Sequence, residues 1–320
     1  MGHDVNGLHH VGHLVRDMDQ AMERYRRLGF TVAAPACPVM PATPEGPAEP
    51  FGVANAHVQF PRGFVELVAV VDHTGRMPGN ARPLPLRVPQ EQVPRLRAAI
   101  RATAATLTSF LRRFQGVHIM IADTSDIDRV AARLTAGDVG HGGVHDIQRP
   151  VETATGTRME PARYLEISDL HLPPGRVPEG RIGFAENTPL NPSQEPPHAD
   201  HPNGATALAG CVLCVADTAL PEVERRYESY FGPARHGRAT RFDRADVTVV
   251  AASALTRLLP GEHPAALPAF VGYTVAVRDL AATEELLRGN GVPTVRTGPD
   301  ELFVPARAAL GAAIIFRQDD

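Results

Sequence analysis

The strongest constraint in this 320-residue sequence is a pattern that occurs four times: an apolar strand, an acidic helix start, an amphipathic helix ending near glycine, and further strands. In the clearest copy, LHHVGHLVRDMDQAMERYRRLGFTV, Asp17 can cap a helix, Gln20 stands at the capping-box position and Gly29 ends the helix. The other copies contain VHIMIADTSDIDRVAARL, GCVLCVADTALPEVERRYESYFG and GYTVAVRDLAATEELLRGNGV. Each copy predicts a βαβββ unit, and the repetition favours this interpretation over an unrelated α+β chain whose helices happen to begin at acidic residues.

One such unit is too small to cover its own sheet, so we expect the units to pair. The predicted fold is α+β, with four βαβββ modules paired into two domains. The first domain covers residues 1–187, a linker follows at 188–206, and the second domain covers 207–320. The linker belongs to a stretch rich in Pro, Gly and Asn, residues 172–206, and an Ala- and Leu-rich segment at 90–115 predicts a helix leading into the second unit.

Composition narrows the classes of partner. The formal net charge is -4, the basic residues are scattered, and the chain has no Lys. We therefore expect neither a nucleic-acid nor a membrane partner, and Schiff-base chemistry and a Walker-type phosphate site are excluded. No apolar run has the length of a signal-peptide core or of a membrane span, which predicts a cytoplasmic protein. Cys211 and Cys214 fall on opposite faces of a strand, which argues against a shared metal.

Four residues are candidates for a metal site. His10 lies in the first strand of the first unit, on the face that carries Gly12, and His118 is taken as its counterpart in the second unit. Glu66 is a lone carboxylate in the apolar strand FVELVAV, and Glu166 repeats this in RYLEISD, taken as the closing strand of the second unit. A buried carboxylate needs a cation, a proton or a metal. If the two units pair about a twofold axis, the four side chains converge, and His with carboxylate suits Zn, Fe(II), Ni, Co or Mn.

Each candidate also has a structural interpretation when taken alone. A strand histidine is commonly a satisfied core or surface residue, Glu66 can pair with an Arg, and Glu166 can face solvent. His57 shares a strand face with Asn55. It lies on the same side of the sheet as the four candidates if the turn after its strand sets the register that way.

A family resemblance follows from these segments. HHVGHLVRDMDQAMERYRRLGF, FVELVAV and the later strands that carry His118 and Glu166 resemble the vicinal oxygen chelate superfamily, which includes glyoxalase, methylmalonyl-CoA epimerase, extradiol dioxygenases and bleomycin-resistance proteins. More narrowly, the chain resembles bacterial glyoxalase-like proteins in which HPNGA, here residues 201–205, introduces a second pair of modules. The resemblance covers almost the whole chain. It implies glyoxalase/bleomycin-resistance/dioxygenase-type domains and maps the metal ligands onto His10, Glu66, His118 and Glu166.

The third and fourth units depart from this pattern. Gly210 and Gly272 stand where the His would fall, and the closing strands of these units carry no Glu. The second domain is therefore expected to bind no catalytic metal and to serve as structure or as a wall of the pocket.

The resemblance implies an activity as well as a fold. A divalent metal would chelate two neighbouring oxygens of a small substrate and stabilise a developing enolate, with Glu166 as the preferred catalytic base and Glu66 as the second choice. This favours a lyase or an isomerase. The alternatives are an Fe(II) dioxygenase that uses two His and one Glu, and a metal-free protein that binds a small molecule, as resistance proteins do. A homodimer is a further open arrangement.

Overall fold

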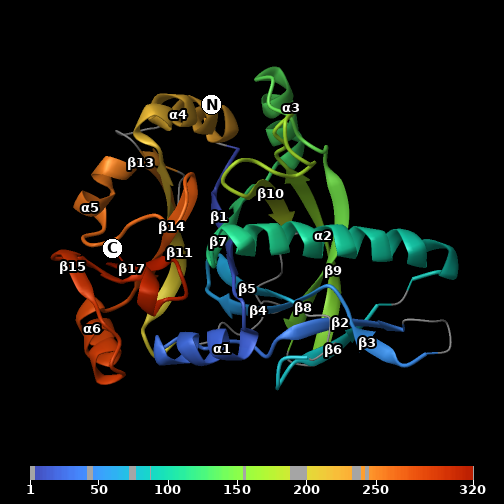
Figure 1. Cartoon of the computed structure of the whole chain (residues 1–320), viewed down its shortest axis with the longest axis horizontal. Helices are drawn as coiled ribbons and strands as arrows, with labels where there is room; N and C mark the ends of the chain where they lie inside the picture. The colour runs from blue at the N-terminus through green and yellow to red at the C-terminus, as the bar shows by residue number, and fades with distance from the viewer. Residues whose placement is uncertain are drawn as a thin grey trace.

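The computed structural model describes residues 4–41, 46–71, 77–86, 88–153, 156–187, 200–232, 239–241 and 245–319. Two curved sheets form the two halves of the molecule and lie side by side (Figure 1), and their ladders meet where Phe270 pairs with Val117. A hydrophobic core runs between the halves, where Phe30 of the first stacks on Phe316 of the second with ring centroids 5.9 Å apart. The prediction of an α+β fold made of βαβββ modules is confirmed.

The sheet of the first half is centred on β1 (Gly7–Leu14), which runs parallel to β5 on one side and antiparallel to β7 on the other. Beyond β5 lie β4, β2 and the short strands β3 and β6, and beyond β7 lie β10, β9 and β8. The bounds are β2 Ala36–Pro41, β3 Ala48–Pro50, β4 Val53–Gln59, β5 Phe64–Val70, β6 Arg82–Pro85, β7 Gly116–Asp123, β8 His145–Thr153, β9 Gly156–Glu166 and β10 Arg181–Asn187.

The second half repeats this arrangement around β11 and β14, which pair antiparallel at its centre. β13 and β12 continue the sheet beyond β11, and β17, β16 and β15 continue it beyond β14. The bounds are β11 Ala205–Val215, β12 Ala239–Arg241, β13 Asp246–Ala251, β14 Ala269–Val277, β15 Val295–Gly298, β16 Glu301–Val304 and β17 Ala313–Gln318.

Acidic residues cap three of the module helices, and in the second module the cap is Asp126, where the sequence favours the preceding Ser125. The carboxylates of Asp17, Asp126 and Asp279 each accept the backbone N–H three residues on, at 3.0 Å in each case. The apolar faces of these helices enter the core between the sheets. The helix bounds are α1 Met18–Arg27, α3 Ile127–Ala136, α4 Leu220–Phe231, α5 Leu255–Leu258 and α6 Leu280–Gly289, with 3₁₀ turns at Asp217–Ala219, Ala252–Ala254 and Ala306–Ala308.

The helix predicted at 90–115 is present as α2 (Val93–Arg113), after a 3₁₀ turn at Gln90–Gln92. It crosses the first half in front of the sheet (Figure 1), and its Leu107 and Phe110 join an apolar cluster with residues of β1, β5, β7 and β10. We call the concave face beneath α2 the cup. None of the helices in the described part of the chain is long and apolar enough to cross a membrane.

The closing strand of the second module is not the predicted one. The strand that carries Glu166, β9, is the third strand of its module, and β10 takes the closing place beside β7. The composition of residues 172–206 hid this strand, because Pro and Gly dominate the segments on both sides of it. The predicted linker 188–206 overlaps the start of β11, and its residues 188–199 lie outside the described part, so the domain boundaries stay a prediction.

Candidate functional site

The register between β1 and β7 shows which residues of the first two modules are counterparts. His10 pairs with Ile121 across the ladder, and Gly12 pairs with Ile119. A twofold axis midway between these two pairs exchanges His10 with Ile119 and Gly12 with Ile121. His10 also lies as far before its helix cap, Asp17, as Ile119 lies before Asp126. The counterpart of His10 is therefore Ile119.

His118 lies at a bulge next to that position. The pairing passes from Gly12 with Ile119 to His13 with Val117, so His118 is the extra residue. The matching bulge in β1 is His9, between the pairs of Leu8 and His10. A one-residue difference in register is enough to assign a strand residue to the wrong place.

The surroundings of His118 are apolar and fully buried. Its ring contacts Phe110 and Phe114 with centroids 5.2 and 4.1 Å apart, and its Nε2 lies 3.0 Å from the carbonyl of Phe114. Burial lowers the pKa of His118 to about 4, so this imidazole is neutral. The structure does not bring His118 to the other three predicted ligands.

The carboxylates also occupy different positions in their modules. Glu66 in β5 pairs with Gly12, whereas the residue of β10 in the matching place, opposite Ile121, is Gly183. Glu166 lies one strand further out, opposite Gly183, just as His57 lies opposite Glu66 in the first module. The counterpart of Glu166 is therefore His57, and the second module carries Ile119 and Gly183 where the first carries His10 and Glu66.

Glu66 is the centre of the polar cluster in the first module. Its Oε2 lies 3.9 Å from Nε2 of His10, and its Oε1 lies 4.0 Å from Nε2 of His57. Asn55 donates a hydrogen bond to Oε1 at 3.1 Å. Both imidazoles pack on Phe64, with His10 stacked at 4.7 Å and His57 edge-on at 5.2 Å. The two rings thus flank one carboxylate, each facing a different oxygen.

Both imidazoles are held in the neutral form. Burial lowers the pKa of His10 well below 6.5, and the nearby charges of His9, His57 and Arg181 lower it further. Burial also lowers the pKa of His57, although the charge of Glu66 opposes this shift. Neutral imidazole is the form that binds metals.

Glu166 is occupied by partners that the sequence did not identify. Tyr164 donates a hydrogen bond to its Oε1 at 2.9 Å, and Arg181 donates from Nε at 2.6 Å and makes a closer ion pair through Nη2. The charge of Glu66 acts on both Tyr164 and Arg181, so the two carboxylates belong to one electrostatic cluster. Tyr164 was visible on the same strand face as Glu166, whereas Arg181 was missed because its strand lies in the stretch 172–206, whose composition predicts a connection.

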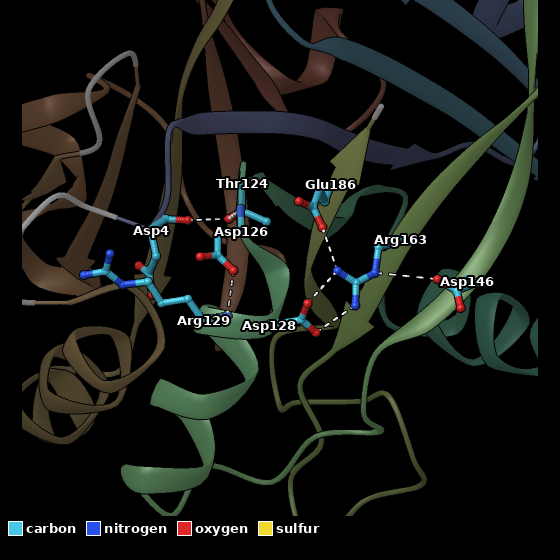
Figure 2. A network of polar contacts seen from close by, with 8 residues as sticks. All are labelled: Asp4, Thr124, Asp126, Asp128, Arg129, Asp146, Arg163 and Glu186. Carbon is cyan, nitrogen blue, oxygen red and sulfur yellow. Dashed lines mark hydrogen bonds and ion pairs between the residues drawn. The ribbon is translucent and has the colours of Figure 1, made fainter. Parts of the chain in front are cut away.

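Arg163, next to Tyr164 in β9, shows that the two faces of this strand have different surroundings. Figure 2 shows its guanidinium between three carboxylates, where it contacts Asp128 at 2.7 Å, Glu186 at 3.2 Å and Asp146 at 3.6 Å. Asp128 belongs to α3, on the face opposite the cup. Strand alternation therefore leaves Tyr164 and Glu166 in the cup.

In the second half, the positions that match His10 and Glu66 carry no histidine or carboxylate. The counterparts of His10 are Gly210 and Gly272, and those of Glu66 are Thr248 and Ile315, read from the same pairing rule. Apolar side chains from β11, β13, β14 and α5 fill the concave face of this sheet. Packed side chains therefore take the place that the cup has in the first half.

The HPNGA segment joins the two halves. The backbone N–H of Thr31 donates to Nδ1 of His201 at 3.0 Å, and Nε2 of His201 lies 2.8 Å from the carbonyl of Gln59. The buried Asn203 donates to the carbonyl of Leu28 at 2.9 Å, and the hydroxyl of Thr283 donates to the carbonyl of Asn203 at 2.8 Å. We call these contacts the HPNGA clamp, because they tie the end of α1 to the start of α6.

Paired βαβββ modules around a His and Glu cup define a protein of the vicinal oxygen chelate superfamily. The chain belongs to the glyoxalase-like domain family, whose model matches residues 8–231. A comparison with curated proteins finds no match.

Solved structures share the fold across nearly the whole chain. A hypothetical protein from Staphylococcus aureus is 10% identical with a TM-score of 0.56, covering 98% of this chain and 100% of its own. A mutant of 4-hydroxymandelate synthase from Streptomyces coelicolor is 12% identical with a TM-score of 0.55, covering 98% and 93%. A xylose isomerase-like TIM barrel/4-hydroxyphenylpyruvate dioxygenase fusion protein is 13% identical with a TM-score of 0.54, covering 100% and 50%. At these identities the likeness establishes the fold alone.

Proposed function

We propose that this protein is a metal-dependent enzyme of the vicinal oxygen chelate type, acting on a small oxygenated substrate in the cup. The observation that carries the proposal is the carboxylate of Glu66 between the Nε2 atoms of His10 and His57, at 3.9 and 4.0 Å. Two neutral imidazoles and one carboxylate are a ligand set used by catalytic Zn and by non-haem Fe(II), both of which keep positions open for substrate.

The fit of a metal to this set rests on donor chemistry. Ligand atoms bound at about 2.1 Å to one ion lie about 3 Å apart, so each ring must close on Glu66 by about 1 Å. As they stand, the described His, Cys, Asp and Glu side chains include no group of three spaced to hold a metal. The proposal therefore requires side-chain adjustment on binding, and it replaces His118 and Glu166 of the predicted set with His57.

A bound divalent ion would polarise a substrate oxygen and favour the enolate form, which is the chemistry of a lyase or an isomerase. Within the chain, Arg181 and Tyr164 hold Glu166 through hydrogen bonds to its Oε1. These donors already occupy Oε1, so Glu166 is engaged within the protein. We therefore assign proton transfer to Glu66, the second choice from the sequence, and assign Glu166 to orienting Arg181.

Metal binding to the purified chain tests this proposal. Protein made without an affinity tag should bind one equivalent of Zn, Mn, Co, Ni or Fe(II) in calorimetric titration, and His57→Ala should lower that affinity at least about tenfold. His263→Ala, which removes an exposed histidine of the second half, is the matched control. Stoichiometric binding that persists unchanged in His57→Ala would overturn the assignment.

Two other functions remain as candidates on specific observations. Two His and one carboxylate also suit an Fe(II) dioxygenase, and oxygen uptake by the Fe(II)-loaded protein with catechols or hydroxyketones would identify that reaction. Ile119 and Gly183 at two ligand positions favour a metal-free binding protein, and a cup that takes up no metal under any of these conditions would support it.

A further inference from the structure

The second module has lost two ligand positions, and the charged groups present in its half of the cup suit an anion. Arg181 pairs with Ile119 in the sheet and donates to Oε1 of Glu166 at 2.6 Å, so its side chain lies on the cup side. Arg176 follows Gly175, which lies against the same carboxylate. Two guanidinium groups thus share this side of the cup.

Arg176 is placed there by the loop that follows β9. Gly175 adopts a left-handed backbone (φ 73°), and a Cβ at this position would stand 2.5 Å from Oε2 of Glu166. The N–H of Gly175 donates to Oγ of Ser168 at 2.8 Å, and the N–H of Asp169 donates to the carbonyl of Arg176 at 2.8 Å. These contacts hold the loop against Glu166, so the position of Arg176 beside the cup is fixed.

The side chain of Arg176 lacks a counter-charge. Its guanidinium lies over the ring of Phe110 of α2, 5.3 Å from the centroid, and its Nε is buried without a hydrogen-bond partner. No carboxylate of the described residues forms an ion pair with it. Burial, and then the like charge of Arg181, lowers the pKa of Arg176. A partly buried cation beside another cation, with an unsatisfied donor, is costly unless an anion completes the site.

An anionic ligand would supply the missing partner of Arg176. The planar guanidinium donors match the two oxygens of a carboxylate.

We infer that Arg176, together with Arg181, forms a subsite for the carboxylate of the substrate, which makes the substrate a small 2-oxo or 2-hydroxy acid. This inference rests on the proposed function for the reaction, although the subsite itself needs no metal. The ketone or hydroxyl oxygen of such an acid would face Glu66 and the two histidines, while the carboxylate would contact the second module.

The test compares an acid with its neutral ester on protein freed of metal by a chelator. Calorimetric titration of the full chain with 2-oxobutanoate and with methyl 2-oxobutanoate gives the ratio of their dissociation constants. The acid should bind about tenfold more tightly than the ester in the wild type, and Arg176→Gln should abolish this preference while Arg176→Lys retains part of it. Arg278→Gln, at an exposed arginine of the second half, should leave the preference unchanged.

Two results would overturn the inference: no preference for the acid in the wild type, including absence of binding at millimolar concentration, or a preference that survives in Arg176→Gln. Near-ultraviolet circular dichroism of each variant establishes that the fold is retained. Because the measurement is made without metal, a failure of metal binding refutes the proposed function and leaves the subsite standing. Metal binding by a protein that shows no acid preference refutes the subsite alone.

Discussion

Acidification should destabilise the fold through two buried histidines near the centre of the molecule. His13 lies with its Nδ1 2.7 Å from the hydroxyl of Tyr25 and its Nε2 2.9 Å from the carbonyl of Leu310 of the other half. Burial lowers the pKa of His13 to about 4 and that of His118 to about 4, whereas both take the ordinary value of about 6.5 in the unfolded chain. The unfolded chain therefore binds more protons, and stability falls as the pH falls through 6.5.

The magnitude follows from these values. Each neutral buried histidine contributes nothing above about pH 7.5 and costs about 2 kcal/mol at about pH 5, and the loss levels off below about pH 4, where the folded form also binds the proton. His118→Phe removes one of these titrations, keeps an aromatic ring against Phe110 and Phe114, and removes the Nδ1 atom that is buried without a partner. The variant should lose about 2 kcal/mol less than the wild type over this pH range.

The chain has no Trp, so urea unfolding is followed by far-ultraviolet circular dichroism or by tyrosine fluorescence. Measurements at about pH 7.5 and about pH 5 give this difference. His263→Gln, a substitution at an exposed histidine of the second half, is the control. Equal losses in the wild type and in His118→Phe would refute the reasoning.

Three further predictions follow from the site and its supports. Ile119→His restores an imidazole at the counterpart of His10 and should raise metal affinity at least about tenfold in competition with a chromogenic chelator, whereas unchanged affinity would contradict the register. Gly12→Ala should cost about 1–3 kcal/mol in urea unfolding, because its Cβ would stand 2.7 Å from the Cβ of Ile119, and a loss no larger than that of Gly289→Ala, where a Cβ meets nothing within 4 Å, would contradict this reasoning. Asn203→Ala should cost about 2–3 kcal/mol by leaving buried groups of the HPNGA clamp unpaired, and a loss no larger than that of the exposed Asn290→Ala would refute the clamp.

The repeated helix starts made the architecture predictable. Asp17 and Asp279 cap their helices as the sequence indicates, because a cap needs only a side chain and backbone groups a few residues away. Such local chemistry can be read without knowing the partners across the sheet. The same holds for α2, whose length and composition are sufficient to predict a helix.

The site was less predictable because it depends on register between strands distant in sequence. His118 and Ile119 are adjacent, and only the pairing with Gly12 shows which one matches His10. The role of His57 depended on the turn before Phe64, which the sequence left open. Arg181 belongs to a strand bordered by Pro- and Gly-rich segments, where composition alone predicts a connection.

The bulge that separates His118 from the ligand position has a consequence for the history of such sites. Deletion of the single codon for residue 119 would bring the imidazole of His118 to the same spacing from its helix cap that His10 has, opposite Gly12. The reverse insertion would remove a ligand without altering any other side chain. In a repeated fold of this kind, the gain or loss of a metal ligand can therefore arise from a change in spacing, with every residue type of the active site preserved.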